Sequence, residues 1–296
     1  MNRCKVMRAA TLLFLLSASL GIARAEESFR MPVYADSPAP PPARSKAEVN
    51  RLLAGADANA AKEDAAQRPL RIVLVAGPKD HDQGEHDYPA WQKVWPRLLK
   101  RTPNTEVDTA WEFPSPKQIE WADVLVFFQR GRWDDERAAA IDPFLARGGG
   151  AVYIHWAVDG QGGQEEFAKR IGLASLGGSI KYRHGEMTVD LSPGADHPIA
   201  RNFDKINILD EAYWQLTGDP SKLDLIGTSI EDGALQPIFW TVERGRGRVF
   251  VSIPGHYSWT FDDPTFRTLL LRGIAWTARR DVDRFNELVT LDARME

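Results

Sequence analysis

Cysteine is almost absent from this sequence of 296 residues, which contains only Cys4. A single cysteine excludes a disulfide framework and any zinc site built from several cysteines. Basic residues are not in excess either, because 37 Lys and Arg stand against 41 Asp and Glu. The sequence therefore lacks the excess of basic residues that is typical of a nucleic-acid-binding protein, so no nucleic-acid partner is expected.

The sequence also lacks an apolar run long enough to span a membrane comfortably. Residues 9–22 are apolar, but basic residues precede them and Ala23-Arg24-Ala25 follows. A basic start, a short apolar stretch and small residues before a cleavage point are typical of a secretory signal peptide. We therefore predict a signal peptide at residues 1–25, with an uncleaved anchor as the alternative.

Cleavage after Ala25 would change the chemistry of the chain. It would remove Cys4 and four of the 37 basic residues, which leaves 33 against 41 acidic ones. The mature protein is expected to be periplasmic or secreted, acidic, free of thiols and without integral membrane association.

Several nucleotide-binding and hydrolase motifs are missing. There is no Gly-x-x-x-x-Gly-Lys sequence, which argues against a P-loop enzyme, and Gly255-His-Tyr-Ser258 is not the Gly-x-Ser-x-Gly nucleophile turn. The glycines at 148–150 precede a predicted strand instead of following one. They therefore indicate the end of a helix and not a dinucleotide-binding loop.

The pattern along the chain divides it into four parts. The signal peptide is followed by a proline-rich linker and N-terminal helical arm at residues 26–69, in which Ser45 begins a short helix. An α/β domain is expected at residues 70–282, and residues 283–296 form a C-terminal tail.

Strands and helices alternate in the first half of this domain. The apolar, β-branched runs typical of strands buried on both faces are at residues 72–76, 105–111, 123–128 and 151–155. Helical patterns lie between them at residues 89–100, from Ser115, and at 134–147. This alternation predicts a mostly parallel sheet with helices on both faces.

The second half adds shorter strands and a closing helix. Strands are expected at 186–191 and 223–228, followed by a hairpin of 236–243 with 248–253. Residues 263–279 are expected to form a long amphipathic helix.

Histidines follow three of the predicted strands: His86, with His81 nearby, after the first, His155 after the fourth and His256 after the hairpin. Ligands of open parallel sheets bind beyond the carboxyl ends of the strands. We therefore expect the side chains of His86, His155 and His256 to lie within about 10 Å of one another, the reach of one small-molecule pocket. Histidine can ligate metals or transfer protons, so His155 and His256 are candidate catalytic residues, while His86 and His81 are candidate metal ligands.

Carboxylates and aromatic side chains complete the candidate site. Glu211 is the candidate acidic catalytic partner. The candidate substrate-binding residues are Asp210, Trp91, Trp156, Tyr257 and Trp259, the aromatic ones as stacking surfaces for a sugar. His197, in a turn before Pro198, is expected to be structural, and the role of His184 stays open.

The sequence resembles the ThuA-like family, which is named for a trehalose-utilisation protein. The resemblance covers roughly residues 71–280 and rests on an ordered set of segments: 84–91, 148–155, 196–199, Asp210-Glu211 with Tyr213, 247–256 and 269–276. It implies a flavodoxin-like fold related to class I glutamine amidotransferases, and a connection with carbohydrate catabolism that includes 3-keto sugars.

The resemblance does not imply glutamine hydrolysis. Those amidotransferases carry a cysteine after a central strand, where this sequence has His155-Trp156. We expect an exported enzyme of the isomerase, lyase or hydrolase type that acts on a keto-sugar or disaccharide derivative. Histidine and carboxylate would supply the acid–base chemistry, and whether a divalent metal assists them stays open. The alternatives are a carbohydrate-binding protein without catalysis and a structural domain of a surface assembly.

Overall fold

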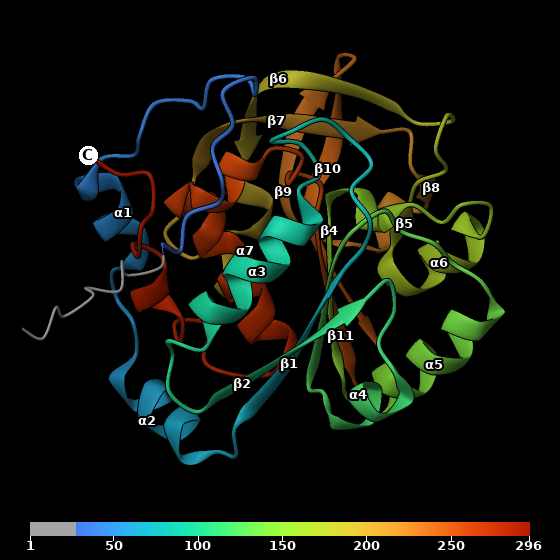
Figure 1. The fold of residues 1–296 in the computed structure, drawn as a ribbon, viewed down its shortest axis with the longest axis horizontal. Helices are drawn as coiled ribbons and strands as arrows, with labels where there is room; N and C mark the ends of the chain where they lie inside the picture. The colour runs from blue at the N-terminus through green and yellow to red at the C-terminus, as the bar shows by residue number, and fades with distance from the viewer. Residues whose placement is uncertain (1–27) are drawn as a thin grey trace, which may run out of the picture.

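A nine-stranded mixed sheet forms the centre of the molecule (Figure 1). Its strand order is β2-β1-β3-β4-β11-β10-β9-β6-β7. The computed structural model describes residues 28–296, so the predicted signal peptide lies outside the described residues.

The parallel strands are β1 (Leu70–Ala76), β2 (Thr105–Trp111), β3 (Val124–Phe128), β4 (Gly150–Ile154) and β11 (Gly247–Ser252). The antiparallel strands are β6 (Lys181–Asp190), β7 (Lys205–Trp214), β9 (Asp224–Glu231) and β10 (Ala234–Arg244).

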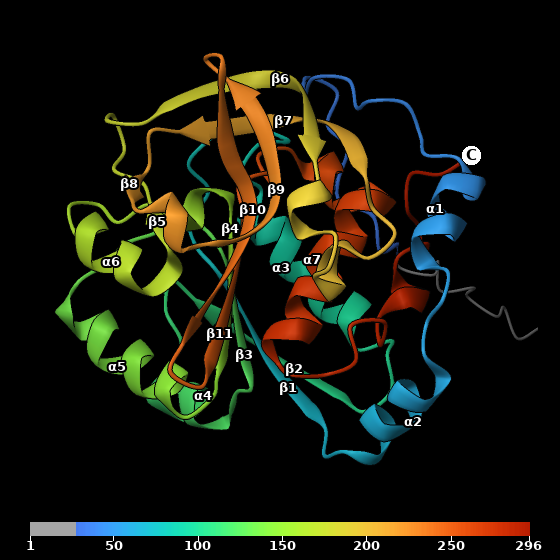
Figure 2. The same ribbon diagram turned by 180° about the vertical axis from the view of Figure 1, so that it is seen from behind.

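Helices cover both faces of the sheet (Figures 1 and 2). One face carries α3 (Tyr88–Leu99) and α7 (Pro264–Thr277), and the other carries α5 (Asp135–Ala146), α6 (Gln164–Ile171) and the short α4 (Pro116–Trp121). The α/β fold predicted from the alternating pattern is confirmed. The remaining elements are α1 (Lys46–Leu53), α2 (Ala58–Ala66), the strand pair β5 (Leu173–Ala174) and β8 (Thr217–Gly218), and the 3-10 turns η1 (His155–Val158), η2 (Ser192–Gly194), η3 (Pro198–Ala200), η4 (Pro220–Lys222), η5 (Ser258–Asp262) and η6 (Asn286–Leu288).

Helix starts follow the expected capping chemistry. Ser45 accepts a hydrogen bond from the Glu48 N–H at the start of α1. Ser115 begins α4 with a full capping box. Asp263 accepts from two backbone N–H groups at the start of α7.

No helix within residues 28–296 has the length and apolar character needed to cross a bilayer.

Two predicted elements differ from their expected environment. The strand at 105–111 is β2, the edge strand, and most of its residues are not buried, because it pairs with β1 on one side only. The helix expected to be amphipathic is α7, and all of its residues are buried. Its polar pattern was misleading because Arg267 and Arg272 do not face solvent.

The two arginines of α7 are buried against the N-terminal arm and the C-terminal tail. Arg272 donates to the carbonyl of Leu52 at the end of α1, and Arg267 donates to the carbonyl of Leu291 in the tail. The arm and tail also pair directly, since Arg44 and Met295 form a β-bridge. A buried guanidinium is tolerated when its N–H groups are satisfied in this way, so these contacts allow α7 to be covered on every side.

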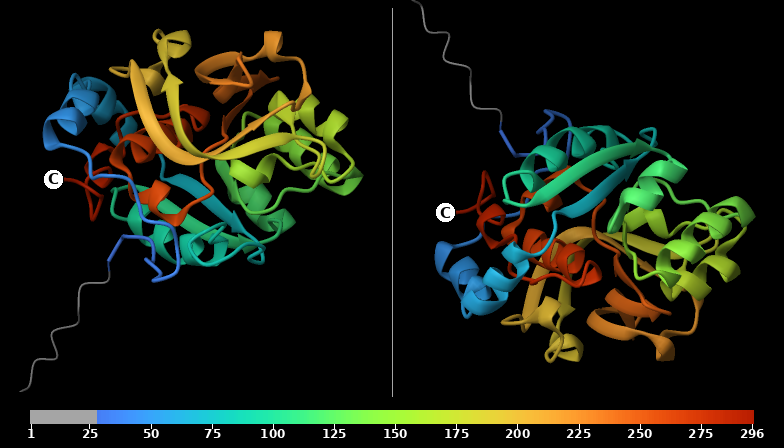
Figure 3. Two further views of the ribbon diagram at one scale, coloured as in Figure 1. Left: turned by 90° about the horizontal axis from the view of Figure 1, so that it is seen from above. Right: turned by 90° about the horizontal axis from the view of Figure 1, so that it is seen from below.

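The loops after β1, β4 and β11 meet at the carboxyl edge of the parallel strands. The antiparallel strands β6 and β7 lie across this end of the molecule (Figures 2 and 3). Strand β7 was not expected from the sequence, because Asp210 and Glu211 interrupt its apolar pattern. This strand brings Glu211 to the same edge as the strand-end histidines.

Gly273 of α7 allows the helix to approach the sheet closely. A Cβ at this position would lie 2.2 Å from the ring of Phe250 on β11. Gly273→Ala is therefore expected to lower the free energy of unfolding by about 3 kcal/mol through overpacking, as measured by denaturant titration. Gly177→Ala is the control, since a Cβ there meets only ordinary contacts of 3.5 Å or more. Equal stability of the two variants would contradict this interpretation of the packing.

Candidate metal centre

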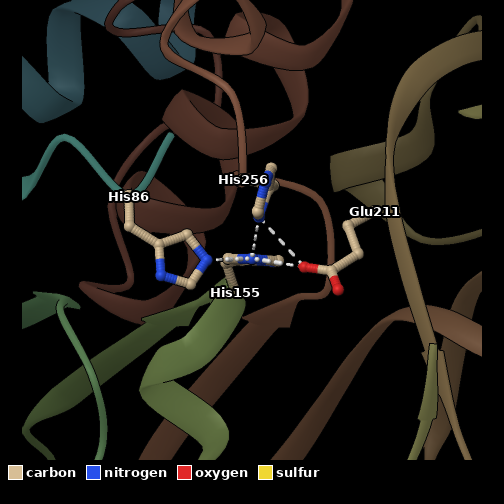
Figure 4. A group of neighbouring side chains, drawn as sticks. All are labelled: His86, His155, Glu211 and His256. Atoms are coloured by element: carbon tan, nitrogen blue, oxygen red, sulfur yellow. Dashed lines mark hydrogen bonds and ion pairs between the residues drawn. The ribbon is translucent and has the colours of Figure 1, made fainter. Parts of the chain in front are cut away.

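Four buried side chains converge at the carboxyl edge of the sheet (Figure 4): His86, His155, His256 and Glu211. One nitrogen or oxygen of each lies within 4.8 Å of the others. The Nε2 atoms of His86 and His155 are 2.8 Å apart, and Nδ1 of His256 is 3.3 Å from Nε2 of His155. Oε2 of Glu211 is 3.2 Å from His155 Nε2 and 3.0 Å from His256 Nδ1. The predicted convergence of the three strand-end histidines is confirmed.

The backbone holds two of these histidines in an uncommon conformation. His155 is the first residue after β4 and has φ 58°, and His86, in the loop after β1, has φ 42°. Left-handed backbone is unfavourable for residues other than glycine, and it often accompanies functional sites. The His86 N–H donates to the carbonyl of His256, so the loops after β1 and β11 are also joined through their backbones.

Hydrogen-bond partners assign the tautomers of His86 and His155. Nδ1 of His155 lies 2.7 Å from the carbonyl oxygen of Ile253, so this nitrogen carries the proton and donates. Nδ1 of His86 lies 2.9 Å from Oδ1 of Asp80 and likewise donates. The two Nε2 atoms that face each other therefore both carry lone pairs, which repel at 2.8 Å unless a cation or a proton lies between them.

His256 can direct either a proton or a lone pair from Nδ1 into the cluster, because Nδ1 lies 3.0 Å from Oε2 of Glu211. Its Nε2 is buried without a hydrogen-bond partner among residues 28–296, and the nearest carboxylate oxygen, of Glu85, is 3.6 Å away. A proton on Nε2 would face this anion, whereas a lone pair there would be repelled by it. With the proton on Nε2, Nδ1 of His256 would direct its lone pair toward His155 and Glu211, as a metal ligand does; without a cation, Nδ1 is placed to donate to Glu211.

The charge states of the cluster suit a cation. Burial, the largest effect, lowers the pKa of His86 to about 2, so this imidazole is neutral at physiological pH. Burial would raise the pKa of Glu211, but the His155 and His256 imidazoles, when they carry protons toward it, hold its pKa well below the usual range; a cation among them would keep it ionised in the same way. Burial raises the pKa of Tyr213 well above its usual value, so its hydroxyl, 2.8 Å from Nε2 of His155, remains protonated. Even with Nδ1 of His256 protonated toward Glu211, this one hydroxyl proton can satisfy only one of the two opposed lone pairs of His86 and His155.

The four ligand atoms fit a tetrahedral ion. Zinc bound by nitrogen and oxygen at about 2.0–2.1 Å separates its ligand atoms by about 3.3 Å. Four of the six separations are 2.8 to 3.3 Å and all six are within 4.8 Å, so modest shifts of the side chains would complete the tetrahedron. Three imidazoles and one carboxylate suit zinc and neighbouring divalent transition metals better than Mg²⁺ or Ca²⁺, which prefer oxygen ligands.

Two further histidines lie above the cluster and mark its exposed side. His184 on β6 places Nε2 3.2 Å from Oε1 of Glu211, and the His81 ring is centred 3.7 Å from that of His86. Their side chains are 44% and 40% exposed. The cluster thus lies one side chain below the surface, with His81 at its rim and not among the four converging atoms. The role of His184 stayed open from the sequence, because its approach to Glu211 results from the β6–β7 register.

Asp210 positions the cluster and does not face a ligand, which corrects its predicted role in substrate binding. This carboxylate is fully buried, and Oδ1 accepts the N–H groups of Glu211, Gly255 and His256. Oδ2 accepts the hydroxyl of Thr260. Both carboxylate oxygens are therefore used to fix the loop that carries His256.

Replacement of Asp210 tests this positioning role. Asp210→Asn removes the negative charge that three N–H groups share and turns an NH₂ group toward the Thr260 hydroxyl, so we expect a loss of about 2 kcal/mol in the free energy of unfolding and at least tenfold weaker metal binding. Denaturant titration and metal competition against a chelator measure the two effects. Asp224→Asn, on β9 and exposed, is the control. Unchanged metal affinity in Asp210→Asn would contradict the positioning role.

The predicted aromatic residues differ in their environments. Trp91 is fully buried against Trp95 and Phe128, so it is a core residue and its predicted role in sugar stacking does not fit the structure. Tyr257 and Trp259 are mostly buried and stack on each other with ring centroids 4.2 Å apart. Trp156 is partly exposed beside the cluster. His197 accepts the Ile199 N–H and packs on Trp276 away from the centre, as a structural histidine would.

A separate hollow of about 590 Å³ lies between α4 and α5. Its lining is mostly apolar and includes Phe113, Ile119 and Pro143. None of the clustered histidines or carboxylates borders it, so it offers no comparable chemistry.

Comparison with known proteins identifies the family. A family profile described as ThuA, trehalose utilisation, matches residues 72–277, well over half of the chain. The chain belongs to the ThuA family. The matched segment contains all four residues of the cluster. No curated protein matches the chain.

Solved structures of ThuA-like proteins have a similar fold. One from Parabacteroides merdae ATCC 43184 has a TM-score of 0.57 at 21% identity, with 71% of this chain and 90% of that chain covered. Another from Bacteroides uniformis ATCC 8492 has a TM-score of 0.57 at 17% identity, with 72% and 93% covered. A β-galactosidase from Bacillus circulans sp. alkalophilus is similar over 71% of this chain and 31% of its own, with a TM-score of 0.51 at 11% identity. At these identities the likeness concerns the fold alone.

Proposed function

We propose that this ThuA-family protein is a metal-dependent enzyme that processes a carbohydrate derivative. His86, His155, His256 and Glu211 would hold one divalent cation, with zinc as the best fit to the donor set. The observation that carries the proposal is the approach of two imidazole lone pairs to 2.8 Å, which a cation between them would turn into favourable coordination. The carbohydrate part rests on the trehalose-utilisation description of the family.

The arrangement suits acid–base chemistry at an oxygen atom of a sugar. A bound cation would polarise a carbonyl or hydroxyl oxygen of the ligand. The Tyr213 hydroxyl, which lies within hydrogen-bonding distance of both His155 and Glu211, can hold or donate a proton beside that oxygen. His81 and His184 line the exposed side, where a ligand would enter. No cysteine exists after residue 25, so a thiol mechanism of the amidotransferase kind is not available to the mature chain.

Metal analysis and turnover test this proposal together. The mature protein is expected to retain about one zinc or similar ion per chain after dialysis, measured by mass spectrometry of the elements. In a screen of keto-sugars, disaccharides and their unoxidised counterparts, turnover should require the ion, disappear with a chelator and return with added metal. A protein that binds sugars but converts none of them would support the carbohydrate-binding alternative. A protein that retains and accepts no ion would contradict the metal centre.

We also propose that the protein is exported. The support is the basic start, the short apolar run and Ala23-Arg24-Ala25 in residues that precede the described structure. Intact-mass measurement of the exported protein should place its first residue at or near Glu26. A mature chain that retains residues 1–25 would contradict this prediction.

A further inference from the structure

Arg130 lies at the same edge of the sheet as the metal centre. It follows β3, which lies between β1 and β4 in the sheet order. The loops after β1 and β4 supply His86 and His155, so the segment after β3 begins between them. No sequence motif marks Arg130 as a functional residue.

A buried carboxylate fixes the guanidinium group of Arg130. Its Nε donates to Oδ2 of Asp159 at 3.2 Å, and Asp159 is fully buried. Oδ1 of Asp159 accepts the N–H groups of Gln161 and Gly177, which ties two further loops to the same point. The Arg130 side chain is nevertheless 51% exposed. Neither of its Nη atoms has a hydrogen-bond partner among residues 28–296.

Short contacts connect this guanidinium to the metal centre. The guanidinium carbon lies 5.9 Å from the centre of the Trp156 ring, and that ring is 5.5 Å from the ring of Tyr213. The Tyr213 hydroxyl contacts His155 Nε2 at 2.8 Å. Gly177 lies beside the guanidinium, since a Cβ there would contact Nη2 at 3.6 Å, and the Arg130 side chain is still 51% exposed. Trp156 and Tyr213 thus form a continuous row of side chains from the guanidinium to the cluster.

We propose that Arg130 binds an oxyanion on the sugar ligand, either a carboxylate or a phosphate, and so selects acidic sugars for the metal centre. This inference rests on the proposed function, because it names the substrate class of the same site. A planar guanidinium with two free Nη atoms presents parallel N–H donors that match the two oxygens of a carboxylate or phosphate. The ion pair with Asp159 uses only Nε of Arg130, so both Nη atoms stay available to a ligand. Because this pair fixes the orientation of the guanidinium, less conformational entropy is lost when a ligand binds.

The test compares three probes on the zinc-loaded mature chain by calorimetry: D-glucuronate, D-glucose 6-phosphate and D-glucose. At least one anionic sugar should bind about tenfold or more tightly than glucose, since a charge-assisted hydrogen bond typically contributes that much. The stronger of the two anions identifies the oxyanion. Arg130→Gln should remove the preference while the zinc content stays the same.

Arg132→Gln is the matched control. Arg132 is also exposed, at 61%, and its Nε pairs with Asp134 at 2.9 Å, so the same kind of surface ion pair is lost there. This variant should keep the preference for the anionic sugar. Equal binding of all three probes, binding of none, or a preference that survives in Arg130→Gln would overturn the inference.

The design separates this inference from the proposed function. A protein that binds zinc but shows no preference for anionic sugars retains the metal centre and loses only the role of Arg130. A protein that binds no zinc contradicts the metal centre, and the same three titrations on the metal-free chain then decide whether Arg130 selects oxyanions.

Discussion

His155→Ala is expected to reduce bound metal from about one ion per chain to less than a tenth of that and to lower turnover by at least two orders of magnitude. His155 is central to the cluster, because its Nε2 contacts His86, His256 and Glu211. Without the His155 imidazole the ion would keep only three protein ligands, and the missing nitrogen is the one that contacts the other three side chains. Elemental analysis and sugar turnover of the same preparation measure both effects.

The stability of the metal-free proteins distinguishes a ligand from a packing residue. Removal of one of two opposed lone pairs relieves repulsion and offsets the lost packing, so metal-free His155→Ala should unfold within a few degrees of the metal-free parent. His197→Ala is the control, because that histidine lies against Trp276 away from the cluster, and it should leave the metal content unchanged. A His155→Ala protein that is strongly destabilised, yet keeps its metal and its activity per folded molecule, would show that His155 is a core residue.

Removal of the metal is expected to lower the melting temperature of the parent protein by about 10 °C. An ion present at a thousand times its dissociation constant stabilises the folded state by about 4 kcal/mol. For a chain of this size each kcal/mol shifts the melting temperature by about 2–4 °C. Thermal unfolding with a chelator, and again after zinc is restored, measures the shift.

Glu211→Gln is the informative variant for the same experiment. The amide keeps the size of the side chain but removes the negative charge that the cation requires. The melting temperature of Glu211→Gln should respond to the chelator much less than that of the parent. Glu186→Gln is the control, because the Glu186 side chain is exposed on β6, and its melting temperature should respond like that of the parent. A parent protein that unfolds at one temperature in chelator and in zinc would contradict the metal centre.

The sequence predicted the parallel half of the sheet because its physical signals are local. The runs at 72–76 and 123–128 are apolar and β-branched, and the glycines at 148–150 end the helix before β4. The position of each histidine after a strand was enough to predict that His86, His155 and His256 meet, since parallel strands end at one edge.

Other features depend on contacts between distant segments and left no local signal. His184 reaches Glu211 only through the pairing of β6 with β7. Asp210 looked like a ligand-binding carboxylate, but its oxygens are used by backbone N–H groups of the loop after β11. Arg267 and Arg272 suggested a solvent-facing side of α7, whereas carbonyl groups of the arm and tail bury them. Trp91 was selected by residue type, which does not distinguish a core indole from one that faces a ligand.

X-ray absorption at the zinc edge would show the ligands of the bound ion. The zinc-loaded mature protein is expected to have three nitrogens and one or two oxygens bound to zinc at about 2.0–2.1 Å, with the outer-atom scattering that imidazole rings produce. The nitrogen count should fall in His155→Ala. A shell of six oxygens without imidazole scattering, as for zinc bound loosely at surface carboxylates, would contradict the assignment of His86, His155, His256 and Glu211 as the metal centre.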